Sequence, residues 1–187
     1  ADMGYKIKLL GVTQMTGRGL EQRMQPCLVP ASSPLGQLQG GTNMIVIEGD
    51  PIEQVVLRGP GAGMGPTASA VMGDVCDIAR GFQLPVFGQP AETLKASTPA
   101  KSTLPAPYYL RMGLVDKPGA LAKIATVLGE AGISIDRMRQ YNHADTAAPV
   151  LIVTHKTSGA SIDVALGAME GNGVLASAPV ALRIEEI

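Results

Sequence analysis

The sequence predicts an α+β protein in two parts, and three observations carry this prediction. Strand-like alternation recurs in the first third of the chain, a glycine-rich stretch opens a helical pattern, and the C-terminal part repeats a strand–helix–strand order. Residues 1–80 are expected to form a partial mixed or antiparallel sheet with one covering helix. Residues 81–107, punctuated by prolines, are expected to be a connector, and residues 108–187 a second α+β unit.

The composition is that of a folded protein and excludes several classes of function. The 187 residues are 45% hydrophobic and 17% charged, with a net charge of −1 and no basic block, so a nucleic-acid partner is not expected. No apolar run reaches the length of a membrane span, and we expect a cytoplasmic protein. Cys27 and Cys76 are expected to be buried thiols, and His143 and His155 lack the spacing of a metal site.

The alternation of apolar and polar residues in the first part predicts four strands, and a short helical turn is expected between the second and the third. The strands are expected at residues 5–12, 20–29, 42–48 and 54–57, and the helical turn at residues 34–38. The first two strands should form a hairpin. Together with one helix, the four strands would make a single layer whose sheet is only partly covered. We therefore expect an edge or face of this layer to be completed by another part of the protein.

The stretch around residues 55–80 is the most informative one in this part. A β-branched run ends in three alternating glycines, Gly59, Gly61 and Gly63, and Pro66 then opens a helix. The apolar face of that helix consists of Ala68, Val71, Met72, Val75, Ile78 and Ala79. Arg80 suits the negative end of the helix dipole, and a glycine follows it.

A glycine loop before a helix start has two interpretations. It exposes backbone N–H groups to an anion or a cofactor, or it is only a tight turn that needs positive φ angles. Methionine and proline at positions 64 and 66 exclude the dinucleotide fingerprint G-x-G-x-x-G, and no Gly-Lys-Ser/Thr of a P-loop follows.

The second part has clearer periodicity. Strands are expected at residues 108–115, 133–141, 150–155 and 180–184, and one helix should follow Asp116, a candidate N-cap, with Pro118 in its first turn. Its apolar face is Leu121, Ile124, Ala125 and Leu128, and that of a later helix is Ile162, Ala165, Leu166 and Met169. The order βαββαβ predicts a ferredoxin-like sandwich.

Two sets of motifs resemble known families. The second part resembles an ACT domain, on D-K-P-G-A-L at residues 116–121, G-I-S-I at residues 132–135 and I-V-T-H at residues 152–155. The first part resembles the C-terminal part of the homoserine dehydrogenase catalytic domain. Its matching segments are G-Y-K-I-K-L-L-G at residues 4–11, Pro34-Leu35 with Asn43, G-P-G-A-G at residues 59–63, and P-T-A-S-A-V at residues 66–71 with Asp74.

The resemblance implies an NAD(P)-dependent oxidoreductase that reduces aspartate semialdehyde to homoserine in threonine, methionine and isoleucine biosynthesis. It implies that Gly61, Ala62 and Gly63 approach the nicotinamide side of the cofactor. The family's dinucleotide domain, catalytic lysine and acidic partners lie upstream of the matching region, so no catalytic residue is assigned here. The chain is therefore expected to be an inactive C-terminal fragment that binds no cofactor alone.

The ACT resemblance implies an amino-acid effector, with threonine expected as a feedback inhibitor. The candidate effector-binding residues are Asp116, Gly119, Ala120 and Asn142, and Asp116 would take the ligand ammonium. A homodimer or higher homo-oligomer is expected. Two alternatives stay open: a free-standing amino-acid sensor without catalysis, and a dimerisation module in which Asp116 only caps a helix.

Overall fold

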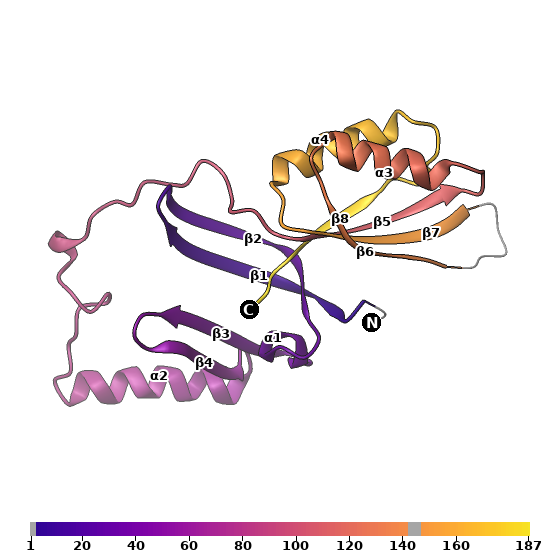
Figure 1. Cartoon of the computed structure of the whole chain (residues 1–187). Coiled ribbons are helices and arrows are strands. Elements are labelled where there is room, and N and C mark those ends of the chain that lie inside the picture. Colours follow the sequence, from indigo (N-terminus) through magenta and orange to yellow (C-terminus); the bar gives the residue numbers. More distant parts are fainter. Residues whose placement is uncertain (1–2, 142–146) are drawn as a thin grey trace. The chain divides into compact units, whose positions relative to one another are not determined.

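A computed structural model of the chain describes residues 3–141 and 147–187 (Figure 1). It divides into two units, one made of residues 1–36 together with 98–187 and the other of residues 37–97. The two units therefore do not follow the boundaries at residues 80 and 107 expected from sequence modules. The division into 1–80, 81–107 and 108–187 stays a prediction.

The first unit begins with a long antiparallel hairpin, as the alternation predicted. β1 (Tyr5–Thr16) pairs with β2 (Gly19–Pro30) over their full length. The hydroxyl of Thr16 donates a hydrogen bond to the carbonyl of Gly19 across the turn, at 2.7 Å. Gly19 has a φ of 116°, which an L side chain rarely adopts, so glycine suits this turn.

The C-terminal part forms the predicted βαββαβ arrangement. Its elements are β5 (Tyr108–Val115), α3 (Ala120–Glu130), β6 (Ile135–Gln140), β7 (Ala147–Thr154), α4 (Gly159–Glu170) and β8 (Val180–Ile184). Both helices lie on the same face of the sheet (Figure 1). The core between them includes the fully buried Leu110, Ile124, Leu128, Ile152 and Met169. This apolar burial is the main stabilising contribution to the unit.

The hairpin and the C-terminal unit share one sheet. The six strands run in the order β1-β2-β8-β5-β7-β6, because β8 pairs in parallel with β2 through Cys27–Arg183 and Leu28–Ile184. Leu28, Val153 and Ile184 form a small buried cluster at this junction. The prediction that the first four strands form one layer is therefore wrong. The first two strands extend the sheet of the C-terminal unit instead.

A buried ionic cluster, here called the junction cluster, lies at the same place and consists of Glu21, Arg23, Arg183 and Glu185. Glu185 Oε1 accepts hydrogen bonds from Arg23 Nη2 and from Arg183 Nε, both at 2.6 Å. Arg23 also pairs with Glu21. Burial opposes a charge on Arg183, but the hydrogen bonds to Glu185 and Tyr108 outweigh it and raise the pKa of the guanidinium above its ordinary value.

The end of the predicted connector is fixed to this unit by backbone hydrogen bonds. The amide of Leu20 donates to Thr98 O at 2.8 Å, and the amide of Ala100 donates back to Leu20 O at 2.9 Å. Leu104 bridges the junction cluster, because its amide donates to Glu21 and its carbonyl accepts from Arg183, both at 2.8 Å. Hydrogen bonds thus hold this part of the connector against the start of β2.

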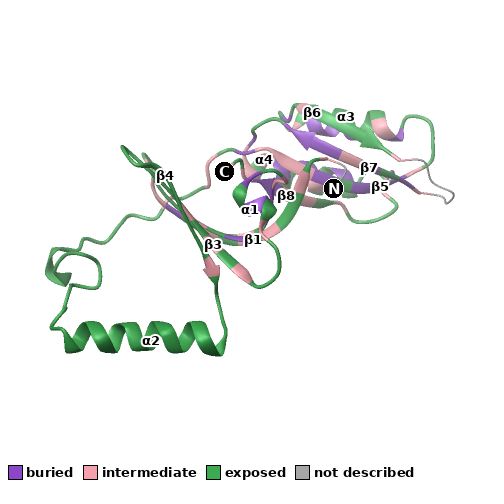
Figure 2. Ribbon diagram, turned by 90° about the horizontal axis from the view of Figure 1, so that it is seen from below, coloured by how far each residue is buried: buried purple, intermediate pink, exposed green. Residues whose placement is uncertain are grey.

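The second unit contains β3 (Thr42–Gly49), β4 (Glu53–Pro60), α2 (Met64–Ala79) and a short helix η1 (Ala91–Thr93), and α1 (Pro34–Gln37) precedes it. Within the described parts of the chain, β3 and β4 pair with each other in a separate two-stranded sheet. No residue of α2 is buried, and Figure 2 shows the helix and most of the hairpin as exposed. The α+β class with mixed and antiparallel sheets expected from the sequence is confirmed, although no sheet buries a residue of α2 within the described residues.

The two cysteines differ in their surroundings. Cys27 in β2 is buried, as expected, whereas Cys76 in α2 is exposed, so the prediction of a buried thiol there is wrong. The reason is that α2 presents its whole circumference to solvent in this chain. Burial, and then the negative charge of Glu185, raise the pKa of the Cys27 thiol above its ordinary value.

Candidate functional site

The glycine loop connects the end of β4 to the start of α2, as the sequence predicted. Gly59 lies inside β4, and Gly61 and Gly63 follow the strand. The local geometry explains why each of the two loop positions is occupied by glycine. A Cβ on Gly61 would collide with the side-chain amide of Asn43 from β3, and Gly63 has a φ of 136°. The backbone conformation thus favours glycine at Gly63, and a side chain at Gly61 would displace the Asn43 amide from its present position.

The start of α2 is open to a ligand. Gly63 is the N-cap residue and supplies no side-chain hydrogen bond, and the first turn carries no acidic residue. Gly61, Ala62 and Gly63 are all exposed, and the next residue, Met64, has 92% of its surface exposed. An uncapped helix start carries partial positive charge on its free N–H groups. This loop can therefore accept an anionic or electron-rich group approaching its backbone.

The second candidate site is the corner between β5 and α3. Gly119, not Asp116, is the N-cap of α3, so the predicted capping role of Asp116 is wrong. The reason is the turn at Pro118-Gly119, in which Gly119 takes a φ of 84° and places Asp116 one turn before the helix. Asp116 and Gly119 are exposed, whereas the side chain of Ala120 is buried.

The corner retains open space near the helix start. A Cβ on Gly119 would meet no atom within 4 Å, and the N-cap residue Gly119 itself has no side chain to accept hydrogen bonds from the first-turn amides. The amide of Ala120 already donates to Lys117 O at 3.1 Å, so the amides available to a ligand are those after Ala120. The fourth predicted effector-binding residue, Asn142, lies outside the described residues.

Two other classes of site receive no support from the described residues. Within 3–141 and 147–187, no group of three or more His, Cys, Asp or Glu side chains could hold a metal ion. No helix in the part of the chain that the structure describes is long and apolar enough to cross a membrane.

Comparison with family models matches the two sequence modules separately. Residues 1–76 match the homoserine dehydrogenase family model, and residues 108–173 match the ACT domain model. The glycine loop and all but the last three residues of the exposed helix α2 lie in the first matched region. The corner at Asp116–Ala120 lies in the second.

Individual proteins agree with the family models. A homoserine dehydrogenase of Neisseria gonorrhoeae is 35% identical over 100% of this chain, and one of Bacillus subtilis is 29% identical over 98%. A crystal structure of a homoserine dehydrogenase from Thiobacillus denitrificans superimposes with a TM-score of 0.85, at 29% identity over 99% of this chain and 43% of that one. A homoserine dehydrogenase structure from S. aureus, at 19% identity and a TM-score of 0.62, shows likeness of fold alone.

The chain spans 45% of the Neisseria gonorrhoeae protein and 43% of the Bacillus subtilis one, and thus less than half the length of these relatives. The resemblances stated from sequence motifs, to the C-terminal part of homoserine dehydrogenase and to an ACT domain, are confirmed. The chain therefore belongs to the homoserine dehydrogenase family and carries an ACT domain.

Proposed function

We propose that this chain is part of an NAD(P)-dependent homoserine dehydrogenase, which reduces aspartate semialdehyde to homoserine in the cytoplasm. The observation that carries the proposal is the match of residues 1–76 to the family model, together with a glycine loop open at a helix start. The nicotinamide cofactor supplies the hydride when bound. No catalytic residue is assigned to this chain, so we expect the 187 residues alone to lack reductase activity and to bind no cofactor.

The glycine loop contributes by letting the cofactor approach its backbone. Gly61, Ala62 and Gly63 are exposed, and no side chain stands at either glycine. A Cβ at Gly63 would meet only the ring of Pro66, at 3.3 Å, so the space beside Gly63 is open toward solvent. We propose that these three residues line the nicotinamide side of the cofactor site.

The ACT domain is proposed to bind threonine and to serve as the regulatory part of a homo-oligomer. Asp116 would accept hydrogen bonds from the ligand ammonium, and amide groups at the start of α3 would donate to its carboxylate. The exposed carboxylate, the helix start at Gly119 and the space beside Gly119 support this site. Asn142 is proposed as a further contact.

The cofactor proposal is tested in the full-length enzyme with Gly63→Val. The variant should raise KM for the reduced cofactor at least tenfold or abolish turnover, because a branched side chain blocks the backbone approach. Gly73→Ala on α2, where a Cβ meets no atom within 4 Å, is the matched control and should keep wild-type kinetics. Unchanged kinetics in Gly63→Val would refute the role of the loop.

The effector proposal is tested by calorimetry of the 187-residue chain with threonine. Binding should occur at millimolar ligand or below and should weaken about tenfold in Asp116→Asn. Asp136→Asn, at an exposed aspartate of β6 in the same unit, should leave the affinity unchanged. Absence of heat at millimolar threonine would favour the dimerisation module instead.

A further inference from the structure

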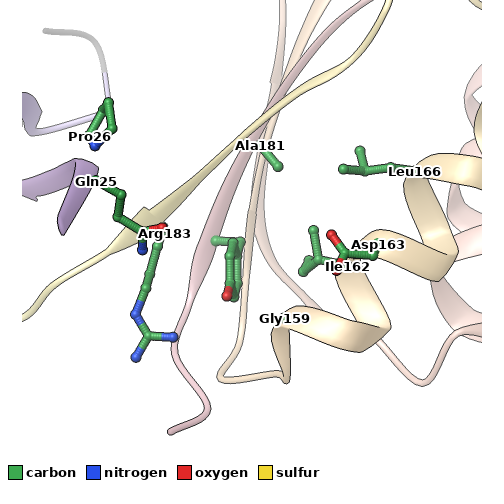
Figure 3. Close-up of a pocket in the computed structure, with 9 residues that line it drawn as sticks. Gln25, Pro26, Gly159, Ile162, Asp163, Leu166, Ala181 and Arg183 are labelled. Atoms are coloured by element: carbon green, nitrogen blue, oxygen red, sulfur yellow. The ribbon is translucent and has the colours of Figure 1, made fainter. Parts of the chain in front are cut away.

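A hollow of about 350 Å³ opens within the first unit, away from the Asp116 corner. It lies where β2, β8 and the first turns of α4 meet, and Figure 3 shows the residues around it. Arg183 and Asp163 come from β8 and α4, respectively, and Tyr108 opens β5. The volume is sufficient for a small metabolite but small for a dinucleotide.

One end of the hollow is polar and buried. Only 6% of Arg183 is exposed, and the Tyr108 side chain interacts with it electrostatically. The Arg183 charge is balanced by Glu185, and the Glu185 charge by Arg23 as well. The junction cluster contains two arginines and two glutamates, so Arg183 lines the hollow without a large net positive charge around it. Its Nε and Nη1 already donate to Glu185 and to the carbonyl of Leu104, which leaves Nη2 as the nitrogen for a further acceptor.

The opposite side of the hollow carries one carboxylate and an apolar wall. Asp163 projects from α4 toward the hollow in Figure 3, and Ile162, Leu166 and Ala181 lie beside it. Among the described residues, Asp163 has no cationic side chain within ion-pair distance. Its carboxylate is therefore available to an external cation.

Gly159, at the start of α4, keeps the space in front of Tyr108 open. A Cβ at this position would lie 3.3 Å from the Tyr108 hydroxyl oxygen. Any larger side chain would extend toward the polar end of the hollow. Glycine here thus leaves the Tyr108 hydroxyl accessible beside the helix start.

The combination of groups selects a class of ligand. A phosphate or a dicarboxylate would be repelled by Asp163, and a purely apolar molecule would leave the carboxylate and the guanidinium without new partners. A zwitterion with an aliphatic side chain offers a partner to each part of the hollow: the polar end, the Asp163 carboxylate and the apolar wall. Its carboxylate faces Arg183 and Tyr108, its ammonium faces Asp163, and its side chain faces Ile162, Leu166 and Ala181.

We propose that this hollow binds a small aliphatic α-amino acid, at a site separate from the threonine site proposed at Asp116. The proposal rests on the lining residues alone and stands whether or not threonine binds at the other corner. A ligand here would contact β2, which lies in the region matching homoserine dehydrogenase, and also β8 and α4 of the C-terminal unit. It would therefore stabilise the junction between them.

The test is calorimetry of the 187-residue chain with L-leucine as the probe. Isocaproate and isoamylamine are the matched half-ligands, since each keeps the side chain but lacks the ammonium or the carboxylate. L-leucine should bind at or below about 1 mM, and each half-ligand should bind at least about tenfold more weakly. Absence of binding of L-leucine at about 10 mM would overturn the proposal.

Two variants localise the site. Asp163→Asn changes an exposed side chain and should weaken L-leucine about tenfold while weakening isocaproate little. Glu170→Gln removes an exposed charge from the last turn of the same helix and should leave the affinity unchanged. Unchanged affinity in Asp163→Asn would overturn the proposal, and so would loss of L-leucine binding in Asp116→Asn alone. Circular dichroism of each variant checks that the fold is retained.

Discussion

Individual glycines in the first sequence module have different structural roles, although they follow one another in a single motif. At Gly61 the Asn43 amide occupies the place of a Cβ and would have to move, whereas at Gly63 the positive φ of the backbone favours glycine. Gly59 lies in β4, where a Cβ would meet no atom within 4 Å. Among these three glycines, Gly63 is the one that combines a positive φ with a helix start, which is why the cofactor experiment uses this position.

The two cysteines should differ strongly in their rate of alkylation. Cys76 is exposed on α2, whereas Cys27 has 0% of its surface exposed. Burial and the Glu185 charge raise the pKa of the Cys27 thiol, so less of the reactive thiolate forms at a given pH.

We expect iodoacetamide at about pH 8 to modify Cys76 at least about 100-fold faster than Cys27, as followed by mass spectrometry of the intact chain and its peptides. Cys76→Ser serves as the control and should leave one slowly reacting thiol. Equal rates for the two cysteines in the folded chain would contradict the burial of β2 at the junction.

At the scale of elements, strong local signals made most helices and strands predictable. The strands at residues 108–115 and 180–184 and the hairpin at residues 5–30 follow from period-two alternation, and the end of α3 follows from Gly132. The N-cap of α3 was not predictable, because both Asp116 and Gly119 are acceptable cap residues and the choice depends on the turn between them.

The spacing of the apolar residues in α2 correctly predicts a helix, but it does not predict whether that apolar face is buried. Period-3.6 spacing identifies a face that some other surface can cover, and it does not identify that surface. Val71, Val75 and Ile78 are each at least half exposed here. An apolar helix face of this kind is typical of an interaction surface.

A matched pair of isoleucines tests how much each helix contributes to stability. Ile124 in α3 is fully buried, whereas Ile78 in α2 is 64% exposed. Ile124→Ala should lower the free energy of unfolding by about 2–5 kcal/mol, because it removes apolar contacts and leaves a cavity. Ile78→Ala should change it by less than about 0.5 kcal/mol in the 187-residue chain, since no cavity forms.

Urea denaturation followed by circular dichroism measures both values. A loss in Ile78→Ala comparable to that in Ile124→Ala would show that α2 packs against another surface in solution. The predicted difference would then be wrong.

At the scale of the whole molecule, the pairing of β2 with β8 joins two sequence modules into one sheet. This contact was not predictable from the sequence, because only two residue pairs make it and they are separated by more than 150 positions. The pocket residues Tyr108, Asp163 and Arg183 were missed for the same reason. A possible signal was the pair of charge patterns Glu-x-Arg in β2 and Arg-x-Glu at the C-terminus, whose alternation places all four charges on one face.

The junction cluster should make Glu185 far more important for stability than its neighbour Glu186. Glu185 is 12% exposed and accepts hydrogen bonds from the buried Arg183 and the partly buried Arg23, so its removal leaves both guanidinium groups without their shared partner. We expect Glu185→Ala to destabilise the first unit by about 3–5 kcal/mol. Glu186 pairs with Lys156 at 3.9 Å in an exposed ion pair, and Glu186→Ala should cost only about 0–1 kcal/mol.

The two adjacent substitutions each remove one negative charge. A difference between their effects on stability therefore comes from the burial of Glu185 and not from the change in net charge. Thermal unfolding at low and at high salt measures both, and added salt should reduce the effect of Glu186→Ala more than that of Glu185→Ala, because buried pairs are poorly screened. If Glu185→Ala unfolds like Glu186→Ala, the cluster does not hold β2 to β8. The continuous six-stranded sheet would then not be an energetically coupled unit.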